Sequence, residues 1–281
     1  MNDCLYHIQE ILKTKKISDS ANKRLFRDFE TIYKRLEKDE YETSGIVENI
    51  FDIPDKTQQL YKLLETYTQI AKDWSLVLNK IPIYKYKEIV DICPGFAPKV
   101  EIGLCYLNYK GKVLLLDNNL KSTKRLIKFI ELFNPQFEMS SYSQDIFSLH
   151  KEQFSFIIGN HIIDDLILSY FAQKSGTLLI NLYEKERELI TMWNKILENE
   201  EYNFEKITRK LSQIFLSLIR KNGYLCLSIY KSYVERMLDL EKSYKFTRKV
   251  FYKLIDILTS NGFTKISCLG NPIKIEVLKN G

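Results

Sequence analysis

Glycine and proline, which interrupt helices and strands, and cysteine, which can cross-link a chain, are scarce in this sequence. It has ten glycines, six prolines and five cysteines among 281 residues. The cysteines are odd in number and form no C-x-x-C pair; they are Cys4, Cys93, Cys105, Cys226 and Cys268. This pattern argues against a disulfide framework and a cysteine-based zinc site, and it favours a reducing compartment.

Long apolar runs and a secretory signal are also absent. No apolar run approaches the roughly 20 residues of a membrane span, and the amino terminus carries Asp3 and His7 within an amphipathic pattern. We therefore expect a cytoplasmic protein with no membrane-spanning segment. No P-loop lysine motif, no Ser/His/Asp order and no paired metal ligands appear, so the sequence predicts no metal.

Neither sign of charge dominates, because 42 Lys and Arg against 36 Asp and Glu leave a formal charge of +6. Hydrophobic residues make up 45% of the chain and charged residues 28%, as in ordinary soluble globular proteins. The positive excess lies in residues 81–281, but no compact basic run with interleaved aromatics appears there. Nucleic acid is therefore not indicated as a partner.

The most informative stretch begins with a short apolar run that contains Asp91 near its end. A tight turn around Gly95 follows, and Pro98 then stands where a first helical position tolerates proline. The next apolar run, 113–116, does not alternate, as expected of a strand covered on both faces, and it ends at Asp117. The pattern predicts a strand–turn–helix–strand unit with carboxylates at the ends of two strands, where open α/β sheets bind ligands.

The turn does not fit a dinucleotide fold, because Cys93 replaces the first glycine of G-x-G-x-x-G and Ala97 and Pro98 crowd the turn. The spacing Asp91-x-Cys93-x-Gly95-x-Ala97 instead resembles D/E-x-G-x-G-x-G, the first motif of class I S-adenosylmethionine-dependent methyltransferases. The middle glycine is kept, and small residues replace the other two.

This resemblance implies that Asp91, Cys93 and Gly95 line the cofactor site. It also implies that Asp117, with Asn118 beside it, binds the ribose hydroxyls of S-adenosylmethionine.

Later motifs match the same family in the same order. Asp145 and Ile146 follow the third predicted strand, where the resemblance implies contacts with the adenine amino group and the ring face. Asn160 and His161 follow the fourth strand, where the family's fourth motif faces the donor methyl group and the acceptor. The resemblance thereby adds Asn160 to the residues expected to bind the cofactor.

The order of elements predicts an α/β, Rossmann-like fold with a seven-stranded, mostly parallel sheet. After the strand that contains Asp91, the predicted strands are 113–116, 136–140, 154–159, 224–229, 263–268 and 272–277. The last two are joined by a turn so short that they can only be antiparallel neighbours. An antiparallel hairpin strand at the carboxyl end of a parallel sheet is the topology of the methyltransferase family.

Two helical regions are predicted beside the sheet. Residues 1–82 are expected to form an all-helical amino-terminal cap, followed by the methyltransferase domain over 83–281. Residues from about 172 to 210 exceed what a simple crossover needs, and helices are predicted over 184–197 and 204–219. We interpret this insertion as a lid that forms together with the cap.

His161 is the candidate general base among three histidines, the others being His7 and His150. Transfer of a methyl group to an O–H or N–H⁺ acceptor requires removal of a proton, and imidazole titrates near neutrality. Asp164, one turn further on, is a candidate to assist. The alternative is that His161 orders the turn or stacks on the cofactor, and that Asp164 and Asp165 cap the next helix.

These patterns predict a methyltransferase that uses S-adenosylmethionine to methylate oxygen or nitrogen of a small-molecule acceptor enclosed by the cap. Asn160 is not followed by Pro-Pro-Tyr/Phe, which argues against methylation of nucleobase or glutamine amines. Two alternatives stay open: an RNA or protein acceptor, and a degenerate fold that binds a ligand or partner without catalysis. The sequence also leaves a homo-oligomer open.

Overall fold

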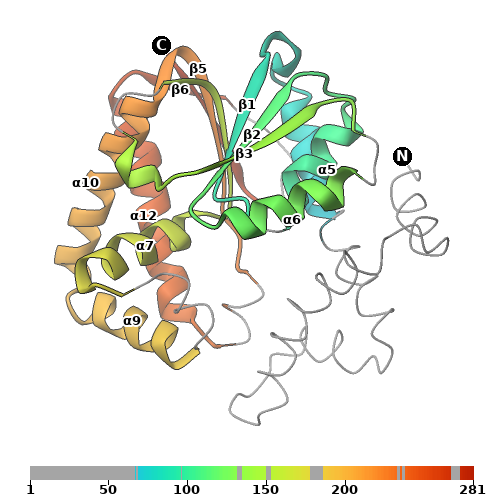
Figure 1. Cartoon of the computed structure of the whole chain (residues 1–281). Helices are drawn as coiled ribbons and strands as arrows, with labels where there is room; N and C mark the ends of the chain where they lie inside the picture. The colour runs from blue at the N-terminus through green and yellow to red at the C-terminus, as the bar shows by residue number, and fades with distance from the viewer. Residues whose placement is uncertain are drawn as a thin grey trace. The chain divides into compact units, whose positions relative to one another are not determined.

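Figure 1 traces the chain in a computed structural model. The described residues are 67, 69–95, 97–131, 135–149, 153–177, 186–232, 235, 238–266 and 273–281. Most of the predicted amino-terminal cap and the predicted turn at 269–271 lie outside this set. The cap, its boundary and its role in a lid therefore stay predictions.

Seven strands form one mixed sheet in the order β3-β2-β1-β4-β5-β7-β6. They are β1 (Glu88–Ile92), β2 (Lys112–Asp117), β3 (Glu138–Ser143), β4 (Phe154–Asn160), β5 (Ile219–Ser228), β6 (Phe263–Ile266) and β7 (Ile275–Asn280). The pairs β1–β2, β2–β3 and β4–β5 are parallel, whereas β7 is antiparallel to both β5 and β6. The predicted Rossmann-like sheet with an antiparallel carboxyl-terminal hairpin strand is therefore confirmed.

The chain divides into two compact units, and the first contains the described residues up to Ser143. Besides β1, β2 and β3, it holds the short 3₁₀ helix η1 (Ile83–Lys85) and the helices α5 (Lys99–Tyr106) and α6 (Leu120–Ile130). The apolar residues of β1 and most of those of β2 are buried, and they therefore form the core of this unit. This burial agrees with the unbroken apolar runs in the sequence.

Helix α5 starts one residue after Pro98, which occupies its N-cap position, so the predicted start is confirmed. Gly103 lies where this helix closely approaches the helical residues 69–78. A Cβ atom on Gly103 would lie only 2.9 Å from the carbonyl oxygen of Ala71. The close approach fixes α5 and, with it, the turn that precedes the helix.

The start of α6 is set by a side-chain cap, and the bounds of β3 differ from the sequence prediction. Helix α6 begins at Leu120, and the backbone N–H of Ser122 in its first turn donates to Asn119 Oδ1 at 3.2 Å. Asn119 is therefore the capping side chain, because it precedes the helix and satisfies one of its free N–H groups. Strand β3 spans Glu138–Ser143 instead of 136–140, since its pairing with β2 runs on to Asp117.

The second unit begins at Gln144 and holds β4 to β7. Its helices are the 3₁₀ helix η3 (Ile146–Ser148), α7 (Ile163–Ser175), α9 (Glu186–Glu198), α10 (Glu200–Leu218) and α12 (Glu241–Ser260). Helices α7, α9, α10 and α12 pack against one another, and they gather on one side of Figure 1. Trp193 of α9 and Phe204 of α10 both meet the ring of Phe246 in α12 edge-on, each with 6.4 Å between centroids.

Both helices predicted for the insertion are therefore present, with shifted ends, and within this unit they pack against α7 and α12. Strand β5 begins at Ile219, five residues before the predicted start. Helix α10 ends at Leu218, within one residue of the predicted end at 219. Asn222, beside Gly223, adopts a positive φ of 60° within the first residues of β5. Asn-Gly is typical of a turn, so the sequence predicted a strand that begins only after it. No helix in the described part of the chain is long and apolar enough to cross a bilayer.

Candidate functional site

The turn between β1 and α5 has two residues in the left-handed backbone region. Cys93 has a φ of 52° and Gly95 a φ of 62°. Glycine adopts this conformation freely, whereas it is strained for a residue with a Cβ atom. Apart from the two chain neighbours of Gly95, no described residue has an atom within 4 Å of where a Cβ atom on Gly95 would lie.

Asp117 at the end of β2 ties the turn to the strand beside it. Its Oδ2 accepts a hydrogen bond from the backbone N–H of Gly95 at 3.1 Å, and its Oδ1 accepts one from the N–H of Asn119 at 2.7 Å. Burial raises the pKa of the Asp117 carboxyl, while these two N–H groups act in the opposite direction. A carboxylate has about four lone-pair positions, so two remain for a ligand. Asn118, beside it, is exposed.

Asp91 does not face open space; it pairs with Glu101 of α5 in the interior. Asp91 is 1% exposed and Glu101 is 0% exposed. Burial is the main cause that raises the pKa of Asp91 well above its ordinary value, and the charge of Glu101 adds to it. Burial also raises the pKa of Glu101 to about 7, against hydrogen bonds that lower it. Ionising both of two buried carboxyls in contact costs free energy, because the two negative charges repel each other. The pair therefore holds a proton near neutral pH.

Sequence reasoning missed Glu101, and the only signal was its place between Val100 and Ile102 on a helix that packs against the core. In this unit the structure brings together Cys93, Gly95 and Asp117, whereas Asp91 is buried in the interior.

In the second unit, Asp145 caps the 3₁₀ helix η3 and accepts a hydrogen bond from the backbone N–H of Phe147 at 3.0 Å. Its other carboxylate oxygen accepts from the side-chain amide of Gln173 in α7. Ile146, its predicted companion, is 3% exposed. The roles predicted for both residues toward adenine stay predictions.

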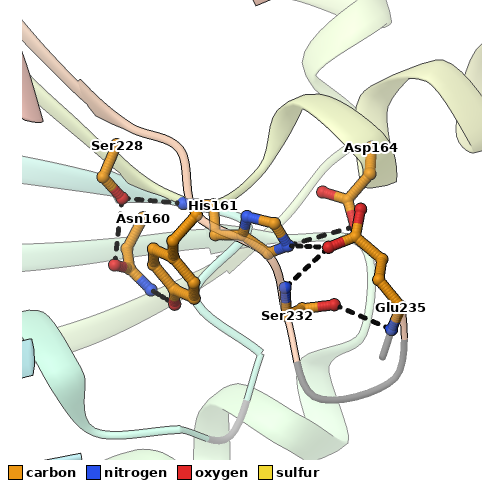
Figure 2. A network of polar contacts seen from close by, with 7 residues as sticks. Asn160, His161, Asp164, Ser228, Ser232 and Glu235 are labelled. Atoms are coloured by element: carbon orange, nitrogen blue, oxygen red, sulfur yellow. Dashed lines mark hydrogen bonds and ion pairs between the residues drawn. The ribbon is translucent and has the colours of Figure 1, made fainter. Parts of the chain in front are cut away.

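Asn160 and His161 at the end of β4 lie in a polar network, which Figure 2 shows from close by. The Asn160 amide donates to the Tyr230 hydroxyl at 3.0 Å, and its Oδ1 accepts from the Ser228 hydroxyl at 3.1 Å. The backbone N–H of His161 donates to the same Ser228 oxygen at 3.1 Å. These bonds join the ends of β4 and β5, so Asn160 serves here to hold the strands together.

The imidazole of His161 is held between an aromatic ring and two carboxylates. It stacks on Tyr230, with 4.5 Å between centroids and 20° between the ring planes. Its Nε2 lies 3.5 Å from Asp164 Oδ2 and 3.5 Å from Glu235 Oε2. His161 itself has a φ of 55°, so the backbone is bent to aim the ring at these acids.

Asp164, for which a role as helix cap was the alternative from the sequence, is not the N-cap residue of α7. Ile162 is the N-cap of α7, without a side-chain hydrogen bond, and Asp164 lies in the first turn. Its carboxylate faces His161, as Figure 2 shows. The predicted pair of His161 and Asp164 is therefore in contact.

Glu235 is the residue of this network that the sequence analysis missed. Its Oε2 accepts from the backbone N–H of Ser232 at 2.6 Å, and its own N–H donates to the Ser232 hydroxyl at 3.2 Å. These reciprocal bonds form a capping box, whose sequence signature is S-x-x-E. The signal, Ser232 followed by Glu235 just after the fifth strand, was present in the sequence.

Comparison with known proteins adds only structural neighbours. No protein-family model matches the sequence, and no curated protein matches it. Several solved structures with a similar fold are methyltransferases. The fold assignment itself rests on the strand order given above.

Three of these structures show the range of similarity. Human N-acetylserotonin methyltransferase in complex with S-adenosylmethionine is 10% identical, with a TM-score of 0.44 over 85% of this chain and 59% of its own. An O-methyltransferase family 2 protein from Planctomyces limnophilus, in complex with apigenin, is 8% identical with a TM-score of 0.46, over 79% and 61% of the two chains. The plantazolicin methyltransferase BpumL with S-adenosylhomocysteine is 13% identical with a TM-score of 0.45, over 83% and 93%. The chain thus spans about three fifths of the length of the first two.

Proposed function

We propose that this chain is an S-adenosylmethionine-dependent methyltransferase that acts on oxygen or nitrogen of a small molecule. The observation that carries the proposal is the bond between Asp117 and Gly95. It joins an open glycine turn to the acid at the end of the next parallel strand. The edge formed by the carboxyl ends of parallel strands is where this kind of sheet binds its ligand.

The residues of the first unit fit the cofactor that the sequence resemblance implies. Gly95 leaves room for a ligand to approach the backbone, because no side chain projects there. Asp117 keeps lone pairs for two hydroxyl donors, and the N–H groups of Gly95 and Asn119 hold its carboxylate in place. A vicinal diol such as that of ribose matches this acceptor.

Bound S-adenosylmethionine would supply a methyl group activated by a sulfonium, so the protein's own task is alignment and removal of a proton. We assign the removal of the acceptor proton to His161 and Asp164, together with Glu235. The buried imidazole between two carboxylates supports this assignment, because the acids stabilise a positive charge that develops there. The acceptor class is inferred from the sequence pattern, in which neither RNA nor base-amine motifs appear.

The test is a calorimetric titration of the protein with S-adenosylmethionine, followed by a screen of small O–H and N–H acceptors for methyl transfer. Asp117→Asn should weaken cofactor binding by about 5- to 150-fold, equivalent to about 1–3 kcal/mol for a lost charge-assisted acceptor. Glu138→Gln serves as the control, since Glu138 is an exposed acid of the same unit that pairs with Lys112. Equal affinity in Asp117→Asn and the wild type would remove Asp117 from the site.

The same screen separates the remaining alternatives. Cofactor binding without turnover on any acceptor would favour a non-catalytic binding protein. Methylation of RNA, with affinity that falls steeply as salt rises, would favour a nucleic-acid acceptor.

A further inference from the structure

Three side chains of the second unit converge on one point, and the sequence analysis had paired only the first two of them. They are His161 at the end of β4, Asp164 in the first turn of α7, and Glu235 after β5. One ligand atom from each lies within 4.8 Å of the other two. All three side chains are largely buried, with exposed fractions of 9% for His161, 15% for Asp164 and 5% for Glu235.

The distances in this cluster are too long for direct hydrogen bonds. A charged N–H···O⁻ bond is about 2.7–2.9 Å long, whereas His161 Nε2 lies 3.5 Å from an oxygen of each acid. Among the residues that the structure describes, Nε2 has no hydrogen-bond partner, and neither does Glu235 Oε1, although both atoms are buried. Buried polar atoms of this kind call for a partner that protein atoms do not provide.

A metal ion explains the same distances. With metal–ligand bonds of about 2.1 Å, neighbouring ligand atoms of a tetrahedral site are about 3.4 Å apart. The two separations of 3.5 Å from Nε2 match this spacing. We therefore propose that His161, Asp164 and Glu235 bind a divalent transition-metal ion of the zinc or manganese type.

The charges and ligand types support this class of ion. With a neutral imidazole the cluster carries two negative charges in a mostly buried place, and two positive charges would balance them. Imidazole nitrogen selects for transition metals over magnesium and calcium, while the two carboxylates also suit manganese. Three protein ligands leave one or more positions for water or for an acceptor oxygen, as in catalytic zinc sites.

Contacts around the cluster orient the ligands in the way that metal sites require. The capping box fixes Glu235, because the backbone N–H of Ser232 donates to Oε2 at 2.6 Å and leaves Oε1 without a partner in the described part of the chain. Stacking on Tyr230 fixes the plane of the His161 ring. Such outer contacts determine the direction of the ligand lone pairs.

With an ion bound, Nε2 would act as a ligand, and the ion would take over the removal of the acceptor proton that the proposed function assigns to His161. The ion would then activate an acceptor oxygen by lowering the pKa of its proton, as it does for bound water. The competing assignment is an imidazolium held between two carboxylates, without a metal.

The test is calorimetric titration of the tag-free protein with ZnCl₂ and with MnCl₂, in the absence of S-adenosylmethionine. We expect one ion per chain in the wild type and a loss of affinity of more than about 100-fold in Glu235→Gln, since even outer contacts of a metal site contribute about 10–100-fold. The control is Asp165→Asn, which also removes one negative charge; Asp165 lies beside Asp164 in the first turn of α7 but outside the cluster. It should bind both ions as the wild type does.

A second measurement uses only wild-type protein and so does not depend on whether a variant folds. The chain has three histidines, and ¹⁵N-histidine NMR during the zinc titration should show a shift of one ring nitrogen of His161 while His7 and His150 stay unchanged. Shifts confined to His7 or His150, equal affinity in Glu235→Gln, or no binding of either ion at millimolar concentration would each overturn the proposal. The last result would favour the imidazolium. Because no methyl donor is present, the outcome is independent of the proposed methyltransferase activity.

Discussion

At the scale of single residues, the buried carboxyl pair of Asp91 and Glu101 makes stability depend on pH. The pKa of Glu101 is raised from 4.5 to about 7 in the folded protein. Between these two values the folded state keeps a proton that the unfolded state has lost. The free energy of unfolding therefore falls as pH rises through this window, by up to about 3 kcal/mol.

We predict that Glu101→Gln reduces this slope, because glutamine is neutral at every pH and its amide can donate to Asp91, while burial still raises the pKa of Asp91 itself. Urea unfolding at pH 5, 6, 7 and 8 measures the effect. Glu138→Gln, in an exposed acid, should keep the slope of the wild type. A Glu101→Gln protein whose stability still falls between pH 5 and 7 as in the wild type would show that the pair does not retain a proton.

Cys93 is a second residue whose effect is local, because it adopts a backbone conformation that glycine adopts more easily. We predict that Cys93→Gly changes the free energy of unfolding by less than about 1 kcal/mol, since relief of strain offsets the greater freedom of the unfolded chain. Cys93→Val should lower it by about 1–3 kcal/mol, because a β-branched residue is strained at positive φ.

Chemical denaturation of the Cys93 variants measures both changes. The control is Cys105→Val in the helix α5, where valine should cost only a few tenths of a kcal/mol in helix propensity. Equal losses at the two positions would contradict the assignment of backbone strain to Cys93.

At the scale of elements, a pair of variants can distinguish the turn before α5, which is proposed to bind the cofactor, from a glycine that only ends a helix. Gly95 and Gly176 have φ values of 62° and 68°, and a Cβ atom on either would meet no described atom within 4 Å. Alanine at either position should therefore lower stability by a similar amount, about 1 kcal/mol. Only Gly95→Ala should weaken S-adenosylmethionine binding, by 10-fold or more, because only this turn is proposed to face the ligand.

Calorimetric titration together with thermal unfolding measures both properties on the same samples. Gly176 ends α7, so Gly176→Ala reports the cost of the backbone conformation alone. If Gly95→Ala binds the cofactor as tightly as Gly176→Ala does, the ligand does not lie over this turn.

The bounds of elements that follow from a local sequence pattern could be predicted from the sequence. The bounds of strands that depend on hydrogen-bond pairing with a neighbouring strand could not. The unbroken apolar run of β2 and the proline before α5 fixed their positions to within about one residue. The carboxyl-terminal hairpin followed from a short connection. The bounds of β3 and β5 were missed because partner strands extend them beyond their apolar residues.

The candidate site was predictable only where each residue follows a strand. Gly95, Asp117 and His161 were found in this way. Glu101 and Glu235 were missed, because their contacts depend on how a helix and a loop pack, which no spacing along the chain records.

At the scale of the whole molecule, ligand binding should appear as a gain in thermal stability. A ligand that binds only the folded state at 100 times its dissociation constant adds about 2.7 kcal/mol, or roughly 5 °C for a chain of this size. S-adenosylmethionine and S-adenosylhomocysteine should both raise the melting temperature of the wild type. NAD⁺ should not, because the turn lacks the glycine pattern of a pyrophosphate site. Stabilisation by NAD⁺ but not by S-adenosylmethionine would contradict the proposed cofactor.

The pairing of β2 on both edges has a consequence for changes of chain length. Its register is held by β1 on one side and by β3 on the other, from Lys112 to Asp117. Deletion of one residue inside β2 would turn every later side chain of the strand to the opposite face, Asp117 included. A deletion in the connection 107–111 would leave that register in place. Related chains should therefore gain or lose residues between the strands, and engineered insertions belong there too.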